Sequence, residues 1–231
     1  SGLMEGGFES LVQLSERHHP AQIAPPAHLR SLGFSRMLAE MSKGRLEAFS
    51  DGVMAIIITI MVLEFRIPAG ADLSALQPLM PKFLSYMLSF VFLGIYWNNH
   101  HHLLQASKQV DGRVLWANLH LLFWLSLFPF VTGWIGESHF APWPVALYGL
   151  VFLLAGSAFF ILSRTLISVH GRDSALATAL GADFKGKASL VIYAVAIPLS
   201  FWSSWVAFGI YILVAIVWLI PDRRIERALA G

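Results

Sequence analysis

The sequence contains no cysteine among its 231 residues. Disulfides, thiolate metal sites and cysteine nucleophiles are therefore excluded. Charged residues are also scarce, at 13% of the chain, whereas soluble domains carry about 25%. Hydrophobic residues reach 56%, which is too many for an ordinary soluble domain of this length. The composition therefore predicts an all-α integral membrane protein, because helices satisfy their own backbone hydrogen bonds in lipid.

Recognisable catalytic motifs are absent as well. The sequence shows no Ser-His-Asp order, glycine-rich phosphate loop, HExxH helix or paired acidic catalytic motif. Three successive histidines, His100, His101 and His102, suggest a metal site, but consecutive helical residues diverge by about 100° and cannot all converge on one ion. We therefore expect no enzyme, no bound metal, no cofactor and no nucleic-acid partner.

Long apolar runs predict six transmembrane helices. These cover residues 45–65, 80–105, 113–135, 142–164, 186–204 and 205–221. The last two are divided by a tight turn expected at Ser203-Ser204, because the apolar run there is too long for one ordinary span. Pro129 and Pro198 are expected to bend the third and fifth helices.

Lysine and arginine are distributed unevenly around these spans. Fourteen of the sixteen lie on one side of the predicted membrane, and only Arg66 and Lys82 lie on the other. The positive-inside rule therefore predicts that both termini are cytoplasmic.

We divide the chain into three parts on this basis. Residues 1–42 are expected to form a mobile cytoplasmic arm, and Ser1-Gly2 ahead of Met4 is typical of a cloning remnant. Residues 43–221 form the six-helix transmembrane domain, and residues 222–231 form a short basic cytoplasmic tail.

The first predicted helix combines charged residues with an apolar run that is hydrophobic enough to enter a membrane. A helix from Gly52 to Phe65 would rise only about 21 Å, whereas a bilayer core is about 30 Å thick and a start near Arg45 gives about 31 Å. Asp51 would then lie near the edge of the core, where ionisable groups usually face a partner or a water-filled path. The alternative is that Ser50 or Asp51 is simply an N-cap.

On a helical wheel, Ile56, Ile60 and Leu63 form one stripe, with Thr59 at its margin. Such a stripe on several copies of one helix can line an axial pore that gates by dewetting, whereas the alternative is a lipid-facing or buried face. Asp51 and Glu47 point about 150° or more away, so we expect them to contact neighbouring helices. Contact with the histidines of the second helix would form either a pH-sensitive latch or a structural polar staple.

A short pattern connects these residues to a known family. Arg45, Phe49, Ser50 and Asp51 form R-x-x-x-F-S-D ahead of an Ile- and Thr-rich helix, which resembles the transmembrane-protein-175 potassium channel family. Further positions resemble the ends of that family's second and third helices: Trp97, His100, Leu103 and Gln105, then Asn118, Pro129, Phe130 and Thr132. The likeness covers residues 43–133, and a single six-helix unit looks like a prokaryotic member.

The resemblance implies a homotetramer in the plasma membrane, with potassium as the permeant ion and the first helix of each subunit around the pathway. In that pattern Ile56 matches the narrow constriction, Ile60 and Leu63 match further apolar rings, and Thr59 matches a threonine layer. No TVGYG filter occurs. We therefore hypothesise that the apolar rings force partial dehydration while four Thr59 hydroxyls replace water oxygens.

The same resemblance implies a structural role for the motif around Asp51. It would tie the first helix to His100 through Asp51 and to adjacent elements through Arg45. The residues expected in this inter-helix network are Arg45, Phe49, Ser50, Asp51, Trp97, His100 and Asn118.

Two other functions remain open from the residues themselves. A proton-coupled secondary transporter would use Asp51, Glu47 and the cluster His100–His102 to bind protons. A membrane scaffold would use the same polar residues only to hold helices together.

Overall fold

The computed structural model describes residues 27–171, 174–181 and 183–219, and all regular structure in those ranges is helical. Most of the predicted arm and the whole predicted basic tail lie outside them. The chain divides into two compact units, residues 1–38 and 39–231, and the second contains every candidate membrane span of the described residues. The elements of the second unit are α2 (Ala27–Leu63, shared with the first unit), the 3-10 helix η1 (Leu73–Leu79), α3 (Met80–Gln105), α4 (Gly112–Ser126), α5 (Phe128–Glu137), α6 (Pro142–His170), α7 (Ala175–Leu180), α8 (Phe184–Leu199) and α9 (Ser204–Leu219).

Four helical stretches are long and apolar enough to cross a membrane. These are Lys43–Leu63, Leu73–Gln105, Gly112–Glu137 and Pro142–His170. They coincide with the first four predicted spans, so the chain is a multi-pass membrane protein. The helices α8 and α9 have 16 residues each in the described part of the chain, which corresponds to about 24 Å of rise.

The structure excludes the N-cap alternative for the first span. Helix α2 runs without interruption from Ala27 to Leu63, so Ser50 and Asp51 lie inside it. It begins well upstream of Arg45, where the predicted span starts. The charged motif and the apolar run therefore share one helix, as the required length predicted.

Prolines lie next to helix ends in the third and fifth predicted spans. The third predicted span is interrupted at Leu127, between the end of α4 and the start of α5, and Pro129 lies in the first turn of α5. The helix is therefore interrupted next to the proline that was expected to bend it, and Pro129 has no N–H for the preceding turn. Pro198 lies in the last turn of α8, which ends at Leu199. The tight turn then spans residues 200–203, slightly before the predicted Ser203-Ser204 position.

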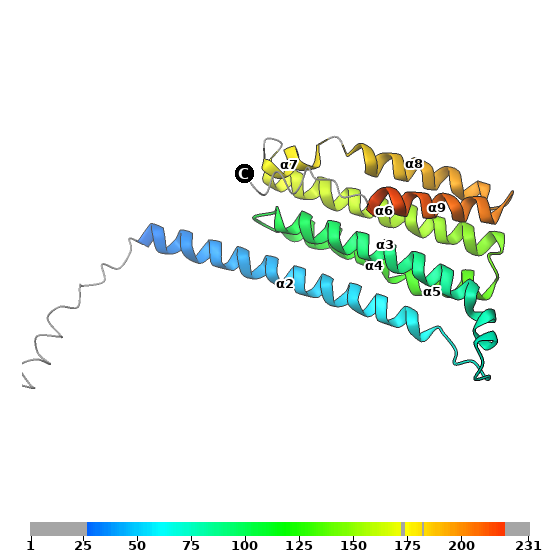
Figure 1. Cartoon of the computed structure of the whole chain (residues 1–231). Helices are drawn as coiled ribbons and strands as arrows, with labels where there is room; N and C mark the ends of the chain where they lie inside the picture. The colour runs from blue at the N-terminus through cyan, green and yellow to red at the C-terminus, as the bar shows by residue number, and fades with distance from the viewer. Residues whose placement is uncertain (1–26, 172–173, 182, 220–231) are drawn as a thin grey trace, which may run out of the picture. The chain divides into compact units, whose positions relative to one another are not determined.

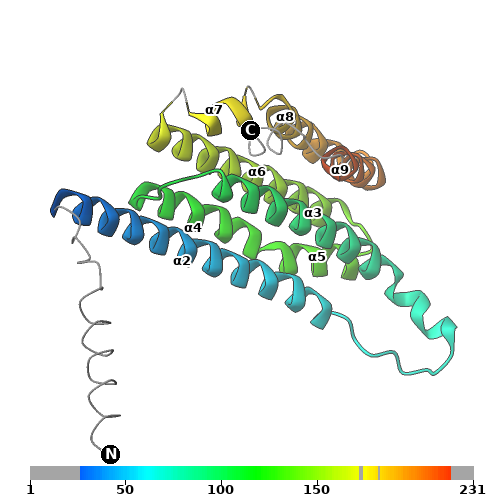
Figure 2. The same ribbon diagram turned by 60° about the vertical axis from the view of Figure 1, so that its left-hand side comes forward.

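Helix α6 occupies the interior of the bundle. In both views α2 lies at one side of the bundle and α8 and α9 lie toward the other, and α9 contacts both α3 and α6 (Figures 1 and 2). Buried aromatic rings fill the space around α6, and the centroids of Phe92 and Phe152 are 4.1 Å apart. A Cβ atom at Gly149 would overlap the hydroxyl group of Tyr211 from α9. This close approach requires glycine at position 149.

One histidine fixes the loop between α3 and α4. The Nε2 atom of His170 accepts the backbone N–H groups of Lys108 and Gln109, at 2.8 and 3.2 Å. Its Nδ1 atom lies 2.8 Å from the carbonyl oxygen of Leu166, to which it donates. The loop is thereby attached to the end of α6, and α4 begins immediately after it with Asp111 as N-cap.

Candidate functional site

Helix α2 has one face covered by the rest of the subunit and one face that is not. The covered face carries buried residues three and four positions apart: Leu46, Ser50, Met54, Ile57 and Met61. The uncovered face carries large apolar side chains in the same stretch. Only 28% of the membrane window of α2 is buried inside the subunit.

The residues of the predicted stripe all lie on the uncovered face. Ile56 is 57% exposed, Ile60 is 41% exposed and Leu63 is 77% exposed. Thr59 is exposed beside them. Its hydroxyl group lies 3.1 Å from the carbonyl oxygen of Ala55 and 2.9 Å from that of Ile56. Because its hydrogen is engaged by the helix backbone, the Thr59 oxygen can act only as an acceptor toward the outside.

A directional chain of hydrogen bonds holds the covered face of α2. His100 of α3 donates from Nε2 to Oδ1 of Asn118 in α4, at 2.7 Å. Asn118 donates from Nδ2 to Oγ of Ser50, at 2.9 Å, and Ser50 donates to the carbonyl oxygen of Leu46, at 2.8 Å. All three side chains are buried. The chain therefore connects α3, α4 and α2, and each of its three side chains donates to an acceptor.

Asp51 bonds a different partner from the one the resemblance implied. Its Oδ1 atom accepts the indole N–H of Trp97 at 3.0 Å. Ser50, the preceding residue, is the one that reaches His100, through Asn118. A helical wheel predicts the direction of a side chain but not which of two adjacent residues meets a given partner. Here the long Trp97 side chain reaches the Asp51 carboxylate.

The remaining polar residues near the Lys43 end of the α2 membrane span do not form a single site. Glu47 lies 3.8 Å from Lys43 on its own helix. Lys43 also donates to the carbonyl oxygen of Gln105 at the end of α3, at 3.4 Å. Arg45 and Phe49 are exposed and line a hollow against α4, where Leu115 and Leu119 lie opposite them. Within the described residues, no three histidine or acidic side chains gather as metal ligands would.

The opposite end of α2 is held by residues that the sequence analysis assigned to no network. Lys82 donates to the carbonyl oxygen of Glu64 at 3.1 Å and pairs with Glu137. Deeper in the bundle, Thr132 of α5 contacts the sulfur atom of Met61.

Thr132 also belongs to a buried hydroxyl cluster. The Oγ atom of Ser89 lies 2.6 Å from the Thr132 hydroxyl and 2.7 Å from that of Tyr148. Ser85 and Ser89, four apart on an apolar helix, indicate a polar face on α3, but their spacing does not identify the residues that they contact.

Comparison with known proteins gives a consistent family. A family profile described as endosomal/lysosomal potassium channel TMEM175 matches residues 45–129. A potassium channel from Chryseobacterium sp. (strain P1-3) is 55% identical over 189 residues, which cover 82% of this chain and 98% of the relative. A potassium channel from Chamaesiphon minutus is 30% identical over 187 residues, which cover 75% of this chain and 91% of the relative. The chain belongs to the TMEM175 family of ion channels.

A solved structure from the TMEM175 family has the same fold. The crystal structure of a lysosomal potassium-selective channel TMEM175 homolog from Chamaesiphon minutus superposes with a TM-score of 0.67 at 29% identity, covering 78% of this chain and 97% of that chain. The human relative, named an endosomal/lysosomal proton channel, is 34% identical over 112 residues, which are only 22% of its length. Because TMEM175 proteins are channels, the expectation that this chain is not an enzyme is confirmed.

Proposed function

We propose that this protein is a potassium-selective channel in which four subunits surround one pathway with the uncovered faces of their α2 helices. The observation that carries the proposal is that face itself. It combines exposed apolar side chains with an acceptor-only Thr59 oxygen inside a membrane-spanning helix.

The uncovered face runs along the whole membrane span of α2. Its exposed residues include Phe49, Gly52, Ile56, Thr59, Ile60 and Leu63. A continuous uncovered face of this length can pack against copies of the same helix around a common axis.

The chemistry of the seam fits a permeant cation. Rings of Ile56, Ile60 and Leu63 would narrow the pathway and oblige an ion to lose part of its hydration shell. Potassium loses water more readily than sodium, and four Thr59 oxygens would supply replacement ligands. The relatives from Chryseobacterium and Chamaesiphon are named potassium channels, which supports potassium rather than another cation.

The remaining architecture follows from the same proposal. Helices α8 and α9 complete a six-helix subunit, and the lysine and arginine bias leaves both termini in the cytoplasm. The channel then lies in the plasma membrane, and its partners are other copies of the chain, the bilayer and potassium. No cofactor takes part.

The contacts of the polar residues weigh against the proton-coupled transporter. Asp51, Glu47 and His100 each bond a different partner, namely Trp97, Lys43 and Asn118. A carrier site needs such groups to converge on one ligand. In this subunit Asp51 and His100 bond neighbouring helices, whereas Glu47 pairs within its own helix.

Recording from the purified protein in a planar bilayer, with potassium on one side and sodium on the other, tests the proposal. We expect unitary currents that reverse near the potassium-selective limit. Repeated electrical silence together with proton-dependent flux into liposomes would replace the channel with a carrier. Absence of flux in both assays would leave only a scaffold.

A further inference from the structure

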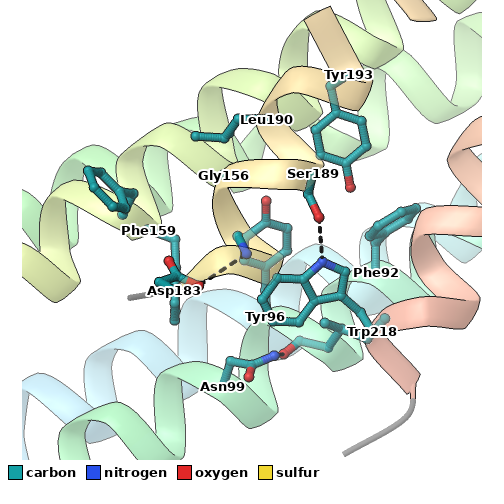
Figure 3. A pocket seen from close by; sticks show the side chains of 13 residues that line it. Phe92, Tyr96, Asn99, Gly156, Phe159, Asp183, Ser189, Leu190, Tyr193 and Trp218 are labelled. Atoms are coloured by element: carbon teal, nitrogen blue, oxygen red, sulfur yellow. Dashed lines mark hydrogen bonds between the residues drawn. The ribbon is translucent and has the colours of Figure 1, made fainter. Parts of the chain in front are cut away.

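A pocket lies on the far side of the subunit from α2, between α3, α6, α8 and α9. Figure 3 shows its walls, which include Phe92, Tyr96 and Phe159, with Trp218 from α9 across them. The pocket is lined mainly by aromatic and aliphatic side chains and is open at its mouth. Nothing in the channel mechanism uses this pocket.

The direction of the pocket follows from the register of the helices around it. Asn99, Phe160 and Asp183 lie toward the end of the bundle that carries the basic loops, whereas Phe92 and Tyr193 lie toward its middle. Asp183 and Tyr193 are ten residues apart, or about 15 Å along a helix. The pocket therefore opens at the basic membrane surface and extends toward the centre of the bilayer.

Two cations lie over aromatic residues of the pocket wall. The Arg164 guanidinium is 5.1 Å from the ring centroid of Phe160. The Lys185 ammonium is 4.8 Å from the ring of Trp218. Cations held in this way over apolar rings stay near the membrane surface, with an apolar space directly below them.

The register between α6 and α8 places Arg164 and Lys185 at a similar depth in the membrane. A Cβ atom at Gly156 would meet Leu190, and one at Gly149 would meet Ile197. The two contacts share one register, so α6 and α8 run antiparallel and Lys185 of α8 falls opposite Ile161, three residues before Arg164. Lys185 is therefore about one helical turn away from Arg164 along the axis.

Two of the polar groups inside the pocket are already hydrogen-bonded to other parts of the chain. Asp183 accepts the backbone N–H of Gly186 at 3.0 Å as the N-cap of α8, and Ser189 accepts the indole N–H of Trp218 at 2.9 Å. Tyr96 also lines the pocket, and the described residues offer its hydroxyl group no hydrogen-bond partner. It can donate to an oxygen of a bound molecule.

We propose that this pocket binds an anionic phospholipid of the inner leaflet. The phosphate lies between Arg164 and Lys185, an acyl chain enters the aromatic space, and the Tyr96 hydroxyl donates to an ester carbonyl oxygen. Basic positions at the cytoplasmic boundary combined with an apolar space between helices form a site for a charged headgroup and its chain.

Titration of the full-length protein in detergent with dioleoyl phosphatidylglycerol, followed by native mass spectrometry, tests this site. The matched neutral probe is dioleoyl phosphatidylcholine. We expect phosphatidylglycerol to bind more tightly than phosphatidylcholine, and we expect the double variant Arg164→Gln/Lys185→Gln to weaken it about 25-fold, since each surface cation contributes about fivefold. The control Lys108→Gln/Arg113→Gln removes two cations from the same membrane surface away from the pocket, and should change binding less than about twofold.

A second pair of variants tests the part of the pocket that is proposed to hold the acyl chain. Gly156→Phe and Leu190→Trp fill the space from opposite walls while keeping both cations, so either one that folds should lose phosphatidylglycerol. Inorganic phosphate should not displace the lipid.

Equal binding of the two lipids would overturn the proposal. An equal loss in the Lys108/Arg113 control, or displacement by inorganic phosphate alone, would do the same. Because binding is measured without current, failure here leaves the channel proposal unaffected.

Discussion

Helices α2 and α6 are similarly apolar but are used in opposite ways. Half of the membrane window of α6 is buried within the subunit, against 28% for α2. α6 contacts helices on several sides, including α4, α5, α8 and α9, whereas α2 is covered on one face. A similar level of hydrophobicity therefore serves packing inside the subunit in α6 and contacts outside the subunit in α2.

Their polar residues differ in the same sense. Ser157, Ser163 and Thr165 of α6 donate to carbonyl oxygens of their own helix. In α2, Ser50 and Asp51 bond residues of α4 and α3. Helix α6 combines close packing on several sides with the hydrogen bonds of Tyr148 and His170, whereas α2 is held on one face only. Different substitutions should therefore damage the two helices.

Overfilling the interior of α6 should have the largest effect. Gly149→Leu places side-chain atoms where the Tyr211 hydroxyl lies, and overpacking of this kind costs about 3 kcal/mol or more where backbones must move apart. We expect loss of folded protein, measured by size-exclusion chromatography and thermal unfolding in detergent. Gly209→Leu is the matched control, because a Cβ at Gly209 meets nothing within 4 Å. Similar yields of the two variants would refute close packing at Gly149.

Removing the centre of the polar chain should have the next largest effect. Asn118→Leu leaves the buried Ser50 and His100 without their partner, at a cost of about 2 kcal/mol. Thermal unfolding should show this loss, and the double variant with Ser50→Ala should cost less than the sum of the two single variants. Strict additivity would show that the two residues are not coupled.

On the uncovered face of α2, substitution should change current rather than folding. Ile56→Ala removes a ring from the proposed constriction, so we expect unitary conductance to rise several-fold while the unfolding temperature stays close to that of the parent protein. Ile212→Ala, at an exposed isoleucine of α9, should leave conductance unchanged. If conductance through Ile56→Ala equals that of the parent, Ile56 does not line the pathway.

The smallest expected change is in selectivity. Thr59→Val keeps the shape of the side chain but removes the oxygen from every subunit, and we expect the potassium preference over sodium to fall by about fivefold or more. Thr59→Ser keeps the oxygen and should preserve the reversal potential. An unchanged reversal potential in Thr59→Val would exclude the hydroxyl from ion selection.

The sequence predicted the elements better than the contacts between them. Span length predicted that α2 continues through Asp51, and Pro129 predicted the interruption of the third span, because both depend only on local geometry. Asp51 bonds Trp97, whereas Ser50 bonds Asn118. This choice of partners depends on how far side chains reach between three helices. The Ser89, Thr132 and Tyr148 cluster joins residues up to 59 positions apart, and no local pattern specifies that pairing.

The break at Leu127 has a mechanical consequence for α2. Ser50 near one end of its membrane span contacts α4, on one side of the break, and Met61 near the other end contacts α5, on the other side. Two attachment points on a rigid rod define its inclination. We therefore expect the angle between α4 and α5 to contribute to the tilt of α2.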